Sequence, residues 1–283
     1  MIKVLKAGFY SSIQDKGRVG YASIGVPVSG VMDTYSANIA NSILNNSLED
    51  AVIEITFGGT ELQFLIDAFI CISGGDFSSE INGKSISNNS RIRVLKNDVL
   101  SFGKVNFGVR CYIAVKGGFL SKQVLKSRSF YKNVTKSVRL KKNDLLPIKA
   151  IKEELESTNT SLKILKSLFK SKEITCFKGP EFYLLNAKQQ KQLLNIVFTI
   201  SNDNNRMGYR LNEIIKNEFP SILTSAVLPG TVQLTPSGEL IVLMRDCQVT
   251  GGYPRVLQLT ENAINKLAQK TTNDGFRFHL KLL

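Results

Sequence analysis

The chain has 283 residues, of which 43% are hydrophobic and 21% charged, and its net charge is +14 at pH 7. These values are typical of a globular protein with one large or two ordinary domains, and they exclude a wholly disordered chain. No apolar stretch approaches the ~20 residues needed to cross a bilayer, and residues 1–15 lack the apolar core of a secretory signal. We therefore expect a cytoplasmic protein without a membrane segment.

The positive charge is concentrated in one part of the chain. Residues 122–172 hold about ten of the excess positive charges, with lysine mixed among Asn, Ile and Ser. Proteins that bind nucleic acids usually place aromatic side chains among the basic ones. The pattern therefore favours a solvated lysine-rich surface over a nucleic-acid groove.

Cysteine and histidine usage narrows the chemistry. The single histidine is His279, near the end of the chain, and the cysteines occur at wide spacings without a CxxC motif. These features argue against a histidine-ligated metal site and against a catalytic triad with a histidine base, so we expect no metal. We interpret the cysteines as free buried thiols in a reducing compartment: Cys71, Cys111, Cys176 and Cys247.

Most of the chain is predicted to form short strands, because runs rich in β-branched and aromatic residues alternate with Gly, Pro, Asn and Asp. This rhythm favours a β-sandwich or β-barrel architecture over an alternating strand–helix fold. In chain order the predicted strands are Ile2–Lys6, Val52–Thr56, Glu61–Phe64, Ala68–Ser73, Arg91–Val94, Arg110–Val115, Glu173–Phe177, Ile196–Ile200, Thr231–Leu234, Leu240–Met244 and Val256–Thr260.

Helices are predicted at fewer places. Asp33 can cap a helix that continues to Ile43, and Thr260 can start another that ends near Lys270. Residues 150–170 and 181–194 also have helical spacing. The lysine-rich part is the natural boundary, so we predict a first domain over 1–125, a surface excursion or linker over 126–170, and a second domain over 171–283.

An internal echo favours two related halves. The pattern D-x-x-R-x-G-Y occurs at Asp15–Tyr21 and again at Asp203–Tyr209, and both copies follow a strand-like run. A match of so few residues can also arise by chance.

The first polar cluster lies in residues 12–33. Gln14, Asp15 and Arg18 are close together in a stretch with several glycines. Glycine permits positive φ and close approach of the backbone to a ligand, and arginine binds carboxylates and phosphates. The cluster could bind a small acid or amide. Equally, Asp15 and Arg18 could pair to hold a turn, with Asp33 serving only as a helix cap.

Two further clusters lie in the second half. Residues 201–211 contain Asp203, Arg206 and several amides, which suit an anionic or amide ligand but also an Asn-rich turn. The other follows an apolar strand and ends in a double-glycine bend, which could present backbone N–H groups to an anion or simply be a hairpin turn. Its polar candidates are Gln233, Asp246, Gln248, Thr250, Gly251, Gly252 and Tyr253.

Together these segments resemble the family that includes the C subunit of 5-oxoprolinase, allophanate-hydrolase-subunit-2-like proteins and biotin-dependent carboxyltransferase domains. The resemblance starts at Gly8 and runs close to the C-terminus. It is carried, in order, by SSIQDKGRVGY, GVPVSGVMD, RCYIAVKGGF, GPE, NDNNRMGYRL, LPGTVQLTPSG and DCQVTGGYP.

This resemblance implies a mainly β fold with two cyclophilin-like β-barrel domains and a few short helices. It implies a subunit of an ATP-dependent 5-oxoprolinase that cleaves the 5-oxoproline lactam to glutamate. The partners would be a sister subunit of the B type and a third oxoprolinase subunit of the A type, with ATP bound together with a partner. Alternatively, the chain is the carboxyltransferase half of a biotin-dependent urea-type carboxylase, or a non-catalytic regulator that binds its sister subunit.

The residues matching the family motifs give the candidate site. The chain lacks a biotinyl-lysine motif, which favours the oxoprolinase alternative. It departs from the family where Cys247 replaces an arginine and Val249 a threonine. The resemblance implies catalytic roles for Asp15, Asp33, Arg206 and Asp246, and substrate binding by Gln14, Arg18, Gln233, Gln248, Thr250, Gly251, Gly252 and Tyr253.

Overall fold

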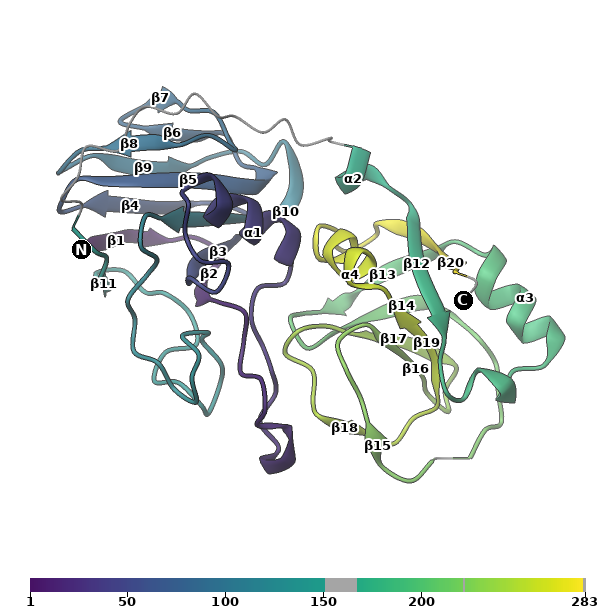
Figure 1. Ribbon diagram of the computed structural model, residues 1–283. Helices are drawn as coiled ribbons and strands as arrows, with labels where there is room; N and C mark the ends of the chain where they lie inside the picture. Colours follow the sequence, from purple (N-terminus) through teal and green to yellow (C-terminus); the bar gives the residue numbers. More distant parts are fainter. Residues whose placement is uncertain (151–166, 221, 282–283) are drawn as a thin grey trace. The chain divides into compact units, whose positions relative to one another are not determined.

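The computed structural model describes residues 1–150, 167–220 and 222–281. The chain is mainly β, as predicted, and divides into two compact units. Unit 1 contains residues 1–18 and 33–150, and unit 2 contains residues 19–32 together with 167–220 and 222–281. These bounds differ from division at residues 125 and 170, because residues 19–32 pack with the second half of the chain. Figure 1 shows the elements of each unit.

Unit 1 is built from two antiparallel sheets. The first has the order β11-β1-β4-β9-β6-β7, with bounds Leu145–Leu146, Ile2–Ala7, Thr60–Phe64, Val99–Phe102, Ser79–Ile81 and Lys84–Ser85. The second has the order β2-β3-β10-β5-β8, with bounds Tyr10–Gln14, Val52–Thr56, Phe107–Val115, Ala68–Asp76 and Ile92–Val94. The two sheets share one hydrophobic core.

The second sheet has two buried faces of opposite character. In β10, Cys111 and Ile113 point into the apolar core, whereas Arg110 and Tyr112 alternate with them and point to the other face. Helix α1 (Thr34–Ile43) packs on β10 and β5. Asp33 caps this helix by accepting a hydrogen bond from the Ser36 backbone N–H at 3.1 Å, which confirms the predicted cap.

The expected surface excursion is instead attached to unit 1. The backbone N–H of Phe130 donates to Ile13, and that of Leu140 donates to Ser11, so this segment follows β2. Ser127 and Leu140 are buried, while the lysines between them remain exposed. The predicted linker continues into residues 151–166, which lie outside the described residues.

Unit 2 contains a closed β-barrel of order β12-β19-β16-β17-β14-β13-β20. Its strands span Glu173–Lys178, Arg255–Leu259, Thr231–Leu234, Glu239–Leu243, Gly208–Ile214, Phe198–Asn204 and Gly275–Leu280. The short strands β15 (Ser225–Ala226) and β18 (Thr250–Gly251) pair beside it. Met32, which precedes the start of unit 1's helix, is fully buried in the core of this unit.

The helices of unit 2 are short. They are α2 (Ser167–Lys170), α3 (Ala187–Asn195) and α4 (Glu261–Ala268), with single 3-10 turns η1 (Ala22–Ile24) and η2 (Phe182–Leu184). Thr260 caps α4 as predicted, since its side chain accepts from the Ala263 backbone N–H. Among the described residues, no helix is long and apolar enough to cross a membrane.

A close backbone crossing joins β12 to β19 in unit 2. Gly179 lies against Arg255, and a Cβ atom built on Gly179 would approach the Arg255 carbonyl oxygen to 2.1 Å. Two residues later, Glu181 accepts hydrogen bonds from the Arg255 backbone N–H at 2.9 Å and from its guanidinium Nη2 at 2.8 Å. The GPE motif is therefore a structural connection between the end of β12 and β19.

We predict that Gly179→Ala destabilises the protein by about 3 kcal/mol, because the new methyl group meets backbone that cannot rotate away. Gly103→Ala is the matched control, since its nearest contact would be 3.6 Å from the Ser78 carbonyl oxygen, and it should change stability by less than about 0.5 kcal/mol. Urea unfolding measures both. Equal midpoints for the two variants would contradict the crossing.

We also predict a pH-dependent contribution from Glu181. Hydrogen bonds from Arg255 lower the pKa of the Glu181 carboxyl below its ordinary value of 4.5. A carboxyl with a lowered folded-state pKa stabilises the protein above its ordinary pKa and loses that contribution as pH falls through the lowered value. The stability difference between wild type and Glu181→Gln should therefore shrink between about pH 6 and pH 3. Arg255→Met should show the same trend, whereas parallel stability curves would refute it.

Candidate functional site

The candidate site in unit 2 centres on a buried ion pair between Arg206 and Asp246. Arg206 Nε donates to Asp246 Oδ2 at 2.8 Å, and Nη2 donates to Oδ1 at 3.0 Å. Arg206 lies in the turn before β14, and Asp246 follows β17. Each residue is only 8% exposed. A two-point contact between guanidinium and carboxylate fixes the orientation of both groups.

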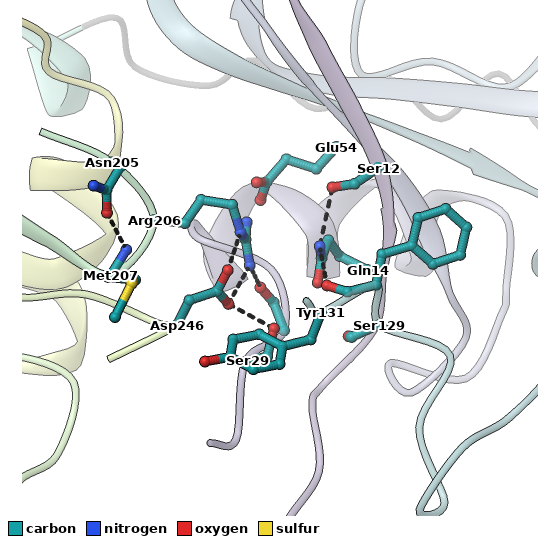
Figure 2. Close-up of polar contacts among 12 residues, drawn as sticks. Ser12, Gln14, Ser29, Glu54, Ser129, Tyr131, Asn205, Arg206, Met207 and Asp246 are labelled. Carbon is teal, nitrogen blue, oxygen red and sulfur yellow. Dashed lines mark hydrogen bonds and ion pairs between the residues drawn. The ribbon is translucent and has the colours of Figure 1, made fainter. Parts of the chain in front are cut away.

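This pair also holds the segment that comes from the first part of the chain. Ser29 Oγ donates to Asp246 Oδ1 at 2.6 Å, and Arg206 Nη2 donates to the Gly30 carbonyl oxygen at 2.5 Å. Figure 2 shows Ser29 beside the Arg206–Asp246 pair. Ser29 has a positive φ of 57° and is 2% exposed, so its unusual backbone conformation is held by these contacts. We call these four residues the clasp.

The double-glycine bend also lies in unit 2, where Gly251 pairs with Ser225. A Cβ on Gly251 would come within 2.4 Å of Gln233 Nε2, so close packing requires glycine here. Gln233 is buried, whereas Gln248, Thr250 and Tyr253 are exposed.

The backbone of this bend does not form an anion-binding turn. Such turns combine right-handed and left-handed residues, and neither Gly251 nor Gly252 has a positive φ. Binding of an anion by these N–H groups therefore has no geometric basis in unit 2.

In unit 1, the carboxylate of Asp15 organises the loop that follows β2. Its Oδ1 accepts from the hydroxyls of Ser127 and Ser129, both at 2.7 Å, and Oδ2 accepts from the backbone N–H of Arg128 at 2.5 Å. Arg18 is 1% exposed and donates to the Ser129 carbonyl oxygen. Asp15 and Arg18 therefore act on the same loop.

The residues Glu54, Arg110 and Tyr112 were missed by the sequence analysis as site candidates. They lie with Asp33 in a buried polar network on the second sheet of unit 1. Tyr112 donates from its hydroxyl to Glu54 Oε2 at 2.9 Å and accepts from the Asp33 backbone N–H at 2.8 Å. The available signal was a glutamate in the otherwise apolar run VIEIT, since an acidic residue in a buried strand must have polar partners.

Burial controls the acidity of two groups in these clusters. It raises the pKa of Tyr112 well above its usual value, with Glu54 adding to the effect, so the hydroxyl stays a neutral donor. Burial also raises the pKa of Cys247 to about 12. The thiol that replaces the family's arginine is therefore protonated, and it is neither a nucleophile nor a positive charge. All four cysteines are buried and unbridged, as predicted.

We predict that Arg206→Met lowers the stability of the protein by about 3–5 kcal/mol, because it leaves the Asp246 carboxylate buried without its cation. The same change should speed chymotrypsin cleavage after Tyr21, which lies in the segment that the clasp holds. Lys6→Met removes an exposed ion pair with Glu61 and should cost about 0–1 kcal/mol without changing that cleavage. Unchanged cleavage in Arg206→Met would show that the clasp does not hold the segment.

Comparisons with known proteins extend these observations. The C subunit of 5-oxoprolinase from Escherichia coli (strain K12) is 31% identical over 276 residues, which are 95% of this chain and 87% of that protein. Urea amidolyase of Lachancea kluyveri is 42% identical over 130 residues, which are 46% of this chain and 7% of that protein.

A solved structure and a family model give the same result. The structure of the Kluyveromyces lactis urea carboxylase matches 98% of this chain at 27% identity and a TM-score of 0.84. This chain spans only 27% of that longer protein. The family model described as "Carboxyltransferase domain, subdomain A and B" matches residues 24–280. The chain therefore belongs to the family of carboxyltransferase domains with subdomains A and B.

Proposed function

We propose that this chain acts as the C-type subunit of a 5-oxoprolinase, which opens the lactam of 5-oxoproline to glutamate at the expense of ATP. The observation that carries the proposal is the match to the C subunit of a 5-oxoprolinase over 95% of this chain and 87% of that protein. By contrast, the urea amidolyase match covers 46% of this chain and 7% of its relative. A relative of similar length supports a similar role more strongly than a shared segment of a much longer protein.

The reaction needs activation because a lactam carbonyl is a poor electrophile. ATP would supply the activation by phosphorylating the lactam oxygen, after which water attacks the ring carbon and the C–N bond breaks. The contribution of this chain would be positioning and electrostatics. We assign Arg206 and Asp246 the role of fixing the Ser29–Gly30 backbone, and Asp15 and Arg18 that of fixing the loop at residues 127–129.

We assign ATP binding to the assembly with partner subunits. The Gly251–Gly252 bend lacks the alternating backbone conformation that cradles phosphate groups. The proposed partners are a sister subunit of the B type and a third subunit of the A type. The Escherichia coli relative is itself named as one of several lettered subunits, which supports a multi-subunit enzyme.

A second candidate is the carboxyltransferase half of a biotin-dependent urea carboxylase. The specific support is the structural match to the Kluyveromyces lactis urea carboxylase over 98% of this chain. Under this alternative a separate biotinylated carrier would deliver the carboxyl group, and urea would accept it. A streptavidin-reactive protein that co-purifies with the chain would favour this candidate.

The proposal predicts ATP-dependent release of glutamate from 5-oxoproline when the chain is co-expressed with its partner subunits, encoded by neighbouring reading frames. Omitting the chain should abolish the activity. Arg206→Gln should lower kcat at least tenfold, because the clasp loses its two-point contact. Arg210→Gln is the matched control, since this arginine lies on β14 and forms ion pairs at 39% side-chain exposure.

Wild-type complex that forms no glutamate but carboxylates urea when a biotinylated carrier is added would reject the oxoprolinase role. Equal losses of activity in Arg206→Gln and Arg210→Gln would reject the special role of the clasp.

A further inference from the structure

A continuous polar row crosses the second sheet of unit 1. Ser12 on β2 lies directly opposite Glu54 on β3, and Glu54 lies opposite Tyr112 on β10. Residues in register on neighbouring strands point to the same face, so all three side chains lie on the face opposite the apolar core. All three are fully buried. Gln14 is two residues beyond Ser12 on β2, so its side chain shares this face.

The orientation of the Gln14 amide is fixed by its partners. Its Nε2 donates to Ser12 Oγ at 3.0 Å and to the Phe130 carbonyl oxygen at 3.4 Å, and the first contact is drawn in Figure 2. A carbonyl oxygen can only accept, so the nitrogen must face Phe130 and the amide oxygen Oε1 must face the other way. This oxygen is buried and accepts no hydrogen bond from any residue that the structure describes.

Such an arrangement selects a particular kind of ligand group. A buried acceptor without a donor is costly, so it is expected to be satisfied by a ligand or an ordered water. Glu54 adds a carboxylate, which accepts from Tyr112 and has lone pairs for further donors. Two neighbouring acceptors would repel a substrate carboxylate and attract an N–H group. Arg110 Nε lies 3.9 Å from Glu54 Oε1, which offsets part of the negative charge and favours a neutral N–H donor over a cation.

We propose that Gln14 Oε1 and the Glu54 carboxylate form an acceptor pair that binds the N–H group of an amide-type substrate. Resting on the proposed function, this group is the lactam N–H of 5-oxoproline. The NH₂ groups of urea offer the same chemistry, so the acceptor pair recognises the shared N–H rather than one substrate.

The test compares 5-oxoproline with the lactone in which a ring oxygen replaces the N–H group, using calorimetry on the chain and on its complex with partner subunits. The lactone presents an acceptor to the pair, so wild type should bind the lactam at least tenfold more tightly. Gln14→Met and Glu54→Gln are close in shape to the native residues, and each should reduce this preference to about threefold or less. Ser73→Ala removes a buried hydroxyl from the same sheet face and should keep the full preference.

A second arm titrates urea into the same proteins. If only urea binds, and binding weakens in Gln14→Met and Glu54→Gln but not in Ser73→Ala, the acceptor pair is supported and 5-oxoproline is rejected as the substrate. The acceptor pair is overturned if wild type binds lactam and lactone equally, if both variants keep the tenfold preference, or if neither N–H probe binds.

Discussion

The arrangement of unit 2 depends on one buried ion pair. Arg206 and Asp246 satisfy each other at two points, and the same charged groups bind the Ser29 hydroxyl and the Gly30 carbonyl oxygen. Removing two charges from water is costly, so such a pair is retained only where its hydrogen bonds are nearly complete. Here the completing groups come from residues 19–32. The ion pair therefore makes an early segment of the chain part of the second unit.

Unit 1 meets a related constraint on one of its sheets. One face of that sheet is apolar and faces the core, while the other carries Glu54, Arg110 and Tyr112 out of water. Buried polar groups of this kind fix a single arrangement when they are satisfied and are costly when they are not. Asp33 links this network to the start of α1, because its backbone donates to Tyr112 while its side chain caps the helix. The chain re-enters unit 1 at this residue.

The sequence predicted much of the fold because local patterns determine it. Val52–Thr56 and Thr231–Leu234 occur as strands with the predicted bounds, and the caps at Asp33 and Thr260 are confirmed. Strand Gly208–Ile214 was missed, because its polar residues resemble a turn when its barrel neighbours are unknown. Arg206 and Asp246 were named as site candidates, but their pairing with each other and with Ser29 depends on contacts across 217 positions, which no local pattern contains. The candidate ligand roles stay predictions.

The central claim is that Arg206 and Asp246 act as one unit in holding the clasp. A double-mutant cycle with Arg206→Met, Asp246→Ala and the combined variant, measured by denaturant unfolding, tests this most directly. The account predicts a coupling free energy of about 2–3 kcal/mol, because either single change strands the other charge. Losses that simply add, with coupling below about 0.5 kcal/mol, would contradict it.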